Sequence, residues 1–201
     1  MQRFIRALLH GLRRFQQNNK IGRAQKNVSH HYDLGNKFYK LFLDSDMQYS
    51  CAFFESPDDT LEEAQRNKQR LIASKMNLKP GDKVLDIGSG WGGMALYLAQ
   101  LEDIEVLGVT LSTEQWELAN QRARETGLSD RVRFELRDYR DVDEKFDSIV
   151  SVGMFEHVGV RHYPEFFGQV KELLHEDGVA LLHSIGHTGP PSFANAWLRK
   201  Y

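Results

Sequence analysis

The sequence predicts an α/β fold, namely a Rossmann-like, doubly wound and mostly parallel sheet with helices on both faces. Two observations lead to this prediction: short apolar runs alternate with helical stretches from residue 83 onward, and the first run passes directly into a glycine-rich turn. Strands that are buried on both faces and joined by crossover helices are typical of parallel sheets. The length of 201 residues favours one domain, and no apolar run approaches the roughly 18 residues that would indicate a membrane span.

The order of the expected elements follows from the same pattern. Helices over 33–45 and 60–77 come first and are expected to form a cap ahead of the sheet. The predicted strands are 83–87, 105–109, 132–136, 147–152 and 178–184, and the predicted helices between them are 92–101, 113–126 and 162–175. We divide the chain into a basic amphipathic segment over 1–28, a helical cap over 29–80 that contributes to the functional site, and a core over 81–201.

The first 32 residues carry seven basic side chains and no acidic one. Their apolar residues recur at helical spacing, as Phe4, Ile5, Leu8, Leu9, Leu12 and Phe15. An amphipathic helix of this kind suits an anionic membrane surface. Docking of the helix on its own protein is an equal alternative, and an organelle transit peptide also stays open. A secretory signal fits poorly because Arg13 and Arg14 bound a short apolar stretch.

Cys51 is the only cysteine, so the chain cannot form an internal disulfide or provide a cysteine-rich zinc site. We therefore expect no bound metal and a cytoplasmic address. Residues 33–201 hold 19 basic and 28 acidic groups, and this acidic balance gives no reason to expect a nucleic-acid partner.

The first predicted strand ends in a glycine-rich turn, where Gly88, Gly90 and Gly93 follow Asp86. A strand, a tight turn and a helix N-terminus let a ligand approach bare backbone and free N–H donors. The three glycines formally satisfy the dinucleotide motif, so a nicotinamide dehydrogenase is an alternative, as is a turn without ligand. Asp86 opposes the dehydrogenase because a pyrophosphate needs positive potential there. A cationic ligand such as S-adenosylmethionine suits this carboxylate better.

The second strand runs into Thr110-Leu111-Ser112-Thr113-Glu114-Gln115 without the terminal acid that usually binds ribose hydroxyls in such sheets. The Gln115 amide is the candidate replacement. The ordinary alternative is that Gln115 belongs to the first turn of a helix that is capped by Ser112 or Thr113.

Three further stretches join the 108–115 segment in a specific order: HYDLGN at 31–36, YSCAFF at 49–54 and SVGMFEHVG at 151–159. Together they resemble the cyclopropane-fatty-acyl-phospholipid synthase family, which includes the mycolic acid cyclopropane synthases. The resemblance extends from about residue 25 to the last residue. It implies an S-adenosylmethionine-dependent class I methyltransferase that adds a methylene across a cis double bond of an acyl chain, with bound bicarbonate as the base.

The same resemblance implies the site residues. The bicarbonate ligands fall on Cys51, Glu156, His183 and the backbone of Ile185. The implied cofactor contacts are Tyr49, Ser50, Val84, Leu85, Asp86, Ile87, Gly88, Ser89, Gly90, Trp91, Gly92, Thr110, Leu111, Ser112, Thr113, Glu114, Gln115, Tyr139 and Arg140. Methyl transfer to an alkene leaves a carbocation, so a small anion at that carbon can both stabilise charge and take the proton that ring closure releases.

Each candidate also has an ordinary alternative. Cys51 could be a small buried hydrophobe, and His183 a hydrogen-bonded core histidine. Glu156 follows an apolar strand, so we expect its carboxylate to be enclosed, where it needs partners or a raised pKa. Asp138 and Arg140 could be solvated loop charges.

The chain stops at Tyr201, where members of the resembled family continue into further helices and strands. We therefore expect a core truncated at its C-terminus, an open sheet edge and a tendency to dimerise. The favoured function is methylation of unsaturated phospholipid acyl chains at the inner face of the membrane to form a cyclopropane fatty acid. A related lipid or small-molecule methyltransferase without ring closure, and an inactive cofactor-binding fragment, are the alternatives.

Overall fold

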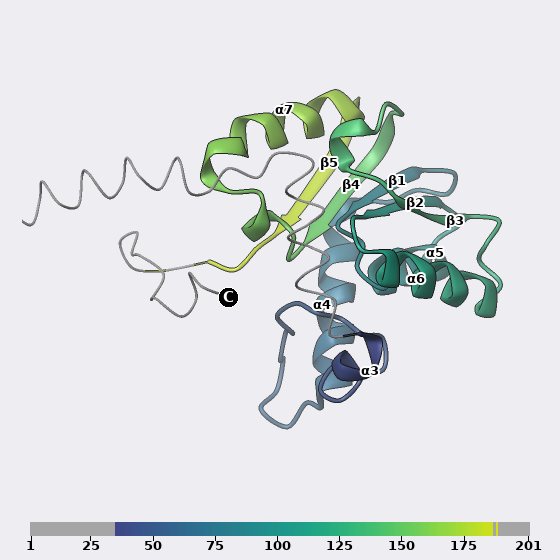
Figure 1. Cartoon of the computed structure of the whole chain (residues 1–201), viewed down its shortest axis with the longest axis vertical. Coiled ribbons are helices and arrows are strands. Elements are labelled where there is room, and N and C mark those ends of the chain that lie inside the picture. The colour runs from purple at the N-terminus through teal and green to yellow at the C-terminus, as the bar shows by residue number, and fades with distance from the viewer. Residues whose placement is uncertain (1–34, 187, 189–201) are drawn as a thin grey trace, which may run out of the picture.

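The structure of the chain is a computed structural model that describes residues 35–186 and residue 188. The described strands form a five-stranded parallel sheet in the order β3-β2-β1-β4-β5, which confirms the predicted doubly wound sheet (Figure 1). They are β1 (Lys83–Ile87), β2 (Glu105–Thr110), β3 (Val132–Leu136), β4 (Phe146–Val152) and β5 (Leu174–His183). The strand order reverses between β1 and β4, and ligands of such sheets bind at the carboxyl ends beside this point. The amphipathic helix predicted in 1–28 lies outside the described residues.

Helices cover both faces of the sheet. α4 (Leu61–Met76), α5 (Gly93–Leu101) and α6 (Thr113–Glu125) pack on one face, and α7 (Tyr163–Leu173) packs on the other (Figure 1). Side chains alternate along β1, so Val84 enters the first core while Leu85 and Ile87 enter the second. Because both faces are buried, the strand is apolar at every inward position except Asp86.

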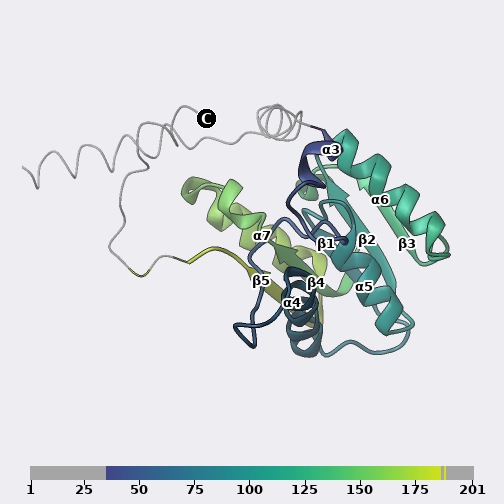
Figure 2. The ribbon, with the colours of Figure 1, turned by 90° about the horizontal axis from the view of Figure 1, so that it is seen from below.

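The helix α4 begins at a capping box. The Thr60 hydroxyl accepts the N–H of Glu63 at 3.3 Å, and the Glu63 carboxylate accepts the N–H of Thr60 at 2.8 Å. Ile72 and Met76 then pack into the same core as Val84. Figure 2 shows α4 crossing β4 and β5, and the helix contacts β5 directly. Lys68, in the middle of α4, is therefore placed near the last strand.

The prediction of a helix over 33–45 is wrong in extent, since α3 spans only Asn36–Tyr39 in the described part of this range. Beyond α3 the Asp44 carboxylate accepts the backbone N–H groups of Asp46 at 3.2 Å and Gln48 at 2.7 Å. These local bonds replace the helical partners of the backbone. α3 is anchored instead by Trp91, whose Nε1 donates to Asn36 Oδ1 at 2.6 Å.

The boundary between α7 and β5 also differs from the predicted one. The helix was expected to reach residue 175 and the strand to start at 178, whereas α7 ends at Leu173 and β5 starts at Leu174. Leu174 pairs in register with Phe146 of β4, and the register shifts before Ser148. Pairing with β4 thus overrides the helical pattern of these residues, because tertiary context outweighs local propensity.

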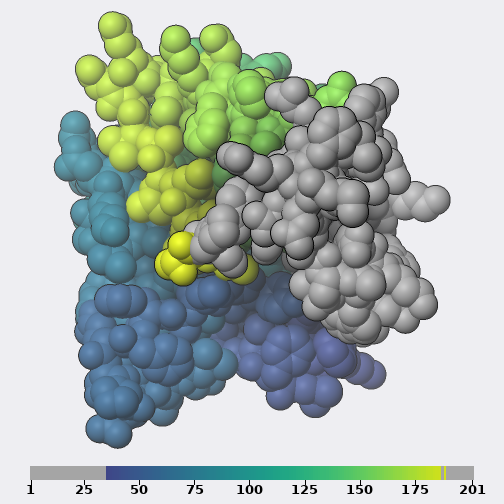
Figure 3. All heavy atoms as spheres, turned by 90° about the vertical axis from the view of Figure 1, so that its left-hand side faces the viewer, coloured from purple at the N-terminus to yellow at the C-terminus, as the bar shows by residue number. Residues whose placement is uncertain are grey.

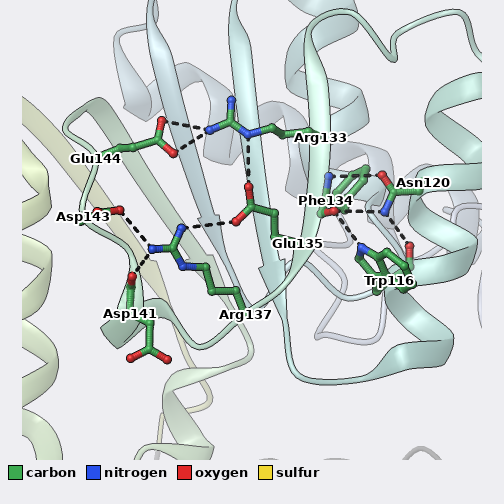
Figure 4. A network of polar contacts seen from close by, with 9 residues as sticks. All are labelled: Trp116, Asn120, Arg133, Phe134, Glu135, Arg137, Asp141, Asp143 and Glu144. Carbon is green, nitrogen blue, oxygen red and sulfur yellow. Dashed lines mark hydrogen bonds and ion pairs between the residues drawn. The ribbon is translucent and has the colours of Figure 1, made fainter.

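Charged side chains line the edge strand β3 and the loop that follows it (Figure 4). Arg133 pairs with Glu144 at 2.7 Å and with Glu135 at 3.4 Å. Arg137 pairs with Glu135 at 3.5 Å and with Asp143 at 3.0 Å. Charges on an edge strand oppose pairing with another chain, so this edge of the sheet is protected.

The backbone of the edge strand β3 is tied to α6 (Figure 4). Trp116 Nε1 and Asn120 Nδ2 both donate to the backbone carbonyl of Phe134, at 2.9 and 3.1 Å. These bonds hold β3 against α6 just before the loop that carries Tyr139 and Arg140. The loop therefore leaves the sheet from a fixed strand end.

Candidate active site at the carboxyl ends of the strands

The glycine turn after β1 adopts a backbone that favours glycine. Gly88, Gly90 and Gly92 have φ angles of 79°, 54° and 84°. A Cβ atom on Gly88 would lie 2.6 Å from the Cγ of Met154, so no side chain fits there. α5 begins at Gly93, directly after the turn. The turn therefore presents its backbone and the N-terminal end of α5 at the carboxyl end of β1.

Asp86 places a buried carboxylate beneath this turn. The residue is 2% exposed, and its Oδ2 atom has no hydrogen-bond partner among the described residues. Burial raises the pKa of Asp86 to about 7. Ser89 Oγ is likewise buried without a partner in the described part of the chain. Two unpaired polar oxygens at one strand end are the mark of a ligand site, since buried polar groups are otherwise hydrogen-bonded.

The remaining predicted contacts of this region have apolar or buried side chains. Val84, Leu85 and Ile87 lie in the two cores, and Trp91 is 3% exposed and packs with Tyr39. These four side chains are therefore committed to packing. What they can present to a ligand is their backbone.

The segment after β2 is held by its own side chains. Thr110 Oγ1 donates to Gln115 Oε1 at 2.8 Å, and Ser112 Oγ accepts the N–H of Gln115 at 3.3 Å as the N-cap of α6. Of the two capping candidates, Ser112 is the cap and Thr113 the first helical residue. Gln115 is 4% exposed. Its amide is thus buried and oriented by Thr110, with the Nε2 donors at the end that Thr110 does not contact.

The other side chains of this segment are less enclosed than that of Gln115. Leu111 and Glu114 are half-buried, and Thr113 is exposed.

The loop after β3 carries a buried ion pair. Arg140 pairs with Asp138 at 2.7 Å, and Asp138, which is 4% exposed, also accepts the backbone N–H of Arg140 at 3.0 Å. The interpretation of Asp138 and Arg140 as solvated loop charges is therefore wrong. The Tyr139 ring packs edge-on against Phe166 with centroids 5.5 Å apart, and burial raises the pKa of Tyr139 to about 12. The loop is therefore held by an ion pair and by aromatic packing.

Glu156 and Ile185 meet at the ends of β4 and β5. Glu156 lies in a short 3-10 helix, Phe155–His157, and its Oε1 accepts the backbone N–H of Ile185 at 2.7 Å. The expectation that Glu156 is enclosed is wrong, because its side chain is exposed. β4 ends at Val152 and the chain turns at Gly153, with φ of 69°, so Glu156 lies outside the sheet rather than in it.

His183 is the last residue of β5 and has a buried Nδ1 atom without a hydrogen-bond partner among the residues described. The residue is only half-buried and belongs to none of the described core clusters, so it is not the core histidine of the alternative interpretation. Burial lowers the pKa of His183, the nearby Lys68 cation lowers it further, and Glu156 opposes both effects. The imidazole is therefore neutral at pH 7.

The segment that carries Tyr49, Ser50 and Cys51 approaches the same strand ends. A Cβ atom on Gly153 would lie 3.3 Å from the Cβ of Ser50, and the N–H of Gly153 donates to the carbonyl of His183 at 3.0 Å. Figure 3 shows the yellow end of β5 lying against the blue part of the chain that includes this segment. Cys51 is exposed, which removes the alternative of a small buried hydrophobe. The structure thus brings the segment of Cys51 together with His183, Glu156 and Ile185.

Sequence reasoning missed Lys68 on α4. Its side chain is 2% exposed, and its Nζ donates to Ser50 Oγ at 2.6 Å. The local sequence EEAQRNKQR gives no signal for burial, because charged residues occupy most of that stretch. The 44–50 segment, which docks on α4, and β5 both lie against the lysine.

The comparison with known proteins identifies the family. A family model described as mycolic acid cyclopropane synthetase matches residues 19–201. The chain belongs to this family. A cyclopropane-fatty-acyl-phospholipid synthase of Escherichia coli K12 is 48% identical to it over 171 residues, which make up 85% of this chain and 44% of the relative. The chain therefore spans less than half of that relative's length.

Solved structures agree with this family assignment. A mycolic acid cyclopropane synthase, CmaA1, crystallised with SAH and CTAB, superposes with a TM-score of 0.76 at 42% identity, over 79% of this chain and 55% of that one. A coclaurine N-methyltransferase bound to N-methylheliamine and SAH matches with a TM-score of 0.74 at 27% identity, over 86% of this chain and 51% of that one. The parallel sheet of the family is thus shared with a methyltransferase that is not named for lipids.

Proposed function

We propose that the chain carries the S-adenosylmethionine-binding part of a cyclopropane synthase, which transfers a methyl group to a cis double bond of an unsaturated phospholipid acyl chain. The observation that carries the proposal is the unpaired, buried Oδ2 of Asp86 at the end of β1. A buried carboxylate needs a partner, and the sulfonium and ammonium groups of the cofactor are cationic. SAH in the structure of the related CmaA1 supports this choice of ligand.

The residues around Asp86 fit the rest of the cofactor. The glycine turn leaves open space over the backbone of Gly90, where a Cβ atom would meet no atom within 4 Å, and Ser89 Oγ offers a further unpaired oxygen. Gln115 Nε2 is proposed to donate to the ribose hydroxyls, since Thr110 holds the opposite end of the amide. Tyr139 offers an aromatic ring to adenine, and Arg140 is fixed beside that ring by Asp138. When bound, S-adenosylmethionine supplies the methyl group.

The proposed anion site is made by Cys51, Glu156, His183 and Ile185. The unpaired Nδ1 of His183 fits a hydrogen-bonding ligand, whereas the N–H of Ile185 already donates to Glu156 Oε1. Glu156 Oε2 is thus the carboxylate oxygen to accept a hydroxyl hydrogen of bicarbonate, while the imidazole accepts or donates at its ring nitrogen according to its tautomer. When bound, bicarbonate supplies a base close to the reacting carbon.

These residues can orient the bound base while no side chain of the protein forms a bond to the substrate. Transfer of a methyl group to an alkene forms one C–C bond and leaves a carbocation, and closure of the three-membered ring forms a second C–C bond with loss of one proton from the transferred methyl group. Glu156 and the neutral His183 hold the proton acceptor in place at the ends of β4 and β5. The product gains one CH2, and one proton leaves with the base.

The substrate class places the proposed reaction at a membrane surface. In the part of the chain that the structure describes, no helix combines the length and apolarity needed to cross a bilayer. Several large apolar side chains of the segments before α4 are exposed, namely Phe38, Leu41, Phe42, Phe53 and Phe54. Exposed apolar groups of this kind suit contact with lipid. We propose a peripheral position at the inner face of the membrane, in the cytoplasm.

The experiment that tests the proposal uses methyl-labelled S-adenosylmethionine and vesicles of cis-unsaturated phospholipid, with and without bicarbonate. Fatty-acid mass analysis should show a gain of one CH2 with loss of the alkene, and only in the presence of bicarbonate. Vesicles of saturated phospholipid are the matched control and should give no product. Methyl-branched or methylene products would show a related enzyme without ring closure. Cofactor binding with no product of any kind would show a cofactor-binding fragment and contradict the proposed activity of this chain.

A further inference from the structure

A buried lysine lies behind the proposed anion site. Lys68 is 2% exposed, yet it belongs to a stretch of α4 whose composition is mostly polar and charged. Its Nζ donates to Ser50 Oγ at 2.6 Å. Burying an ammonium group costs free energy unless charges and hydrogen bonds compensate for it. The burial of Lys68 therefore has to be offset by interactions with its neighbours.

The hydrogen bond to Ser50 connects Lys68 with the strand ends. Ser50 precedes Cys51 and lies against Gly153, whose N–H donates to the carbonyl of His183. Gln65, one helical turn before Lys68, supports the same segment, because its Nε2 donates to the carbonyls of Gln48 at 3.1 Å and Ser50 at 3.0 Å. α4 thus fixes the backbone around Ser50 from two positions on one face of the helix.

Charged and titratable groups surround Lys68 from each element packed against it. Asp44 and Asp46 face it from the loop after α3, Cys51 from the following segment, and His183 from β5. Burial lowers the pKa of Lys68 to about 8, and the opposing attraction of Asp44 and Asp46 keeps it from falling further. The ammonium form is therefore the main one at pH 7.

The proposed anion site needs such a cation. Glu156 is a carboxylate, Cys51 is a thiol, and His183 has a lowered pKa, so none of these side chains is positive at pH 7. An anion bound beside Glu156 would meet like charge without compensation, which opposes binding. Lys68 lies close enough to act on His183 and Cys51 electrostatically, and hence on an anion between them.

We propose that Lys68 is a positioning residue of the bicarbonate site, which fixes the Cys51 segment through Ser50 and supplies the buried positive charge that allows an anion to bind next to Glu156. This inference rests on the proposed function, since it takes bicarbonate as the anion. It adds to that function the source of the charge. Lys68 acts through Ser50 and through the field of its ammonium group, without contact to the reacting atoms.

The test compares Lys68→Met, Lys68→Arg and the matched control Lys75→Met, which removes an exposed lysine from the same helix. Binding of 13C-bicarbonate to the full chain is followed by NMR. Lys68→Met should weaken binding about tenfold, the effect of an interaction equivalent to one pKa unit. Lys68→Arg should stay within a few-fold of the unchanged chain because it keeps the charge, and Lys75→Met should have no effect.

A second measurement separates the charge from a merely structural role. The pKa of His183, measured by NMR titration and assigned with His183→Gln, should rise in Lys68→Met and stay in place in Lys68→Arg. If Lys68→Met does not fold, the pH profile of bicarbonate binding decides. Affinity of the unchanged chain should fall as the pH rises through about 8, where Lys68 loses its proton, and Lys68→Arg should retain its affinity there.

The outcomes distinguish the inference from the function on which it rests. Equal bicarbonate affinity and an equal His183 pKa in Lys68→Met and the unchanged chain would overturn the role of Lys68. If the unchanged chain binds no bicarbonate, the proposed base is wrong, and the His183 titration alone decides whether Lys68 supplies charge to this site.

Discussion

The carboxylate of Glu156 accepts the backbone N–H of Ile185 across 2.7 Å, and this bond joins the segments that leave β4 and β5. The two strands are neighbours in the sheet, so their carboxyl ends are already adjacent. The bond holds one carboxylate oxygen in a fixed position and leaves the other open to a ligand. It also means that the donor implied for bicarbonate at Ile185 is shared with Glu156.

Glu156→Gln should abolish product formation while cofactor binding stays within about threefold. The glutamine oxygen can still accept the N–H of Ile185, but the charge and the second carboxylate acceptor are lost. Loss of a group that orients the acid–base step reduces rates by roughly 10²–10⁴-fold. The measurement is transfer of labelled methyl groups to cis-unsaturated phospholipid, with S-adenosylhomocysteine binding measured by calorimetry on the same samples.

The matched control for this variant is Glu172→Gln, which changes an exposed glutamate on α7 and should leave both quantities unchanged. Loss of cofactor binding in Glu156→Gln would move Glu156 from the anion site to the cofactor site. Full activity of the variant would remove Glu156 from the chemistry altogether.

Asp86→Asn should change how stability depends on pH. Asp86 has a pKa of about 7 in the folded chain against an ordinary value of 3.8, so between these values the folded state holds a proton that the unfolded state has lost. The resulting stabilisation is complete below pH 3.8 and is lost as the pH rises through about 7. A difference of this size corresponds to on the order of 4 kcal/mol.

The measurement is the free energy of unfolding in urea at pH 4.5 and pH 7.5, for the unchanged chain and for Asp86→Asn. The advantage of Asp86→Asn over the unchanged chain should grow by a few kcal/mol from the lower to the higher pH, since other carboxylates titrate alike in both. Asp58→Asn, at an exposed position, is the control and should show no such change. A constant difference for Asp86→Asn would mean that the buried carboxyl group is not protonated in the folded chain.

Cofactor affinity should depend on the same carboxyl group. If the cationic cofactor pairs with ionised Asp86, its affinity should fall about tenfold per pH unit below pH 7, because binding must then release a proton. Asp86→Asn should bind more weakly at pH 8 and lose this pH dependence. Calorimetry in two buffers of different ionisation enthalpy would detect the released proton directly.

Comparison of S-adenosylmethionine with S-adenosylhomocysteine, which lacks the sulfonium charge, tells which cation Asp86 meets. A pH-independent affinity in the unchanged chain would contradict the pairing.

The sheet could be predicted from the sequence because its signals are local. Each strand contains a short apolar run, although β5 begins at Leu174, before the run that was predicted from 178, and the glycines after Asp86 mark the turn between a strand and a helix. The prediction of a helix over 33–45 failed because the chain leaves the helix after Tyr39 through i→i+3 turns, in which the N–H groups of Leu41 and Phe42 donate to the carbonyls of Phe38 and Tyr39. Composition does not show this early end.

Residues of the candidate site could be predicted from the sequence only where both the residue type and its place at the end of a strand or helix indicate a ligand contact. Asp86 and Gln115 lie at strand and helix ends, so their location follows from the pattern. The exposure of Glu156 does not, since it depends on how the chain turns at Gly153 after leaving the sheet. The burial of Lys68 could not be predicted because its neighbours on α4 are polar. The lysine is covered by a segment that lies almost twenty residues earlier in the chain.

Gly88→Ala should destabilise the chain more than Gly90→Ala, although both glycines belong to one turn and both have positive φ. A Cβ atom at position 88 would lie 2.6 Å from Met154 Cγ, whereas a Cβ atom at position 90 meets no atom within 4 Å. The left-handed backbone costs roughly 1–2 kcal/mol in each variant, and overpacking against Met154 adds about 1–3 kcal/mol at position 88 alone. The measurement is the free energy of unfolding in urea at a single pH. Because the Cβ of Met154 would lie 2.7 Å from the new methyl group as well, relief requires removal of the whole side chain, and the double variant Gly88→Ala/Met154→Gly should recover most of the difference relative to Met154→Gly. Equal destabilisation of the two single variants would show that Met154 moves away freely, and the close approach of Met154 to the turn would then have no part in shaping the cofactor site.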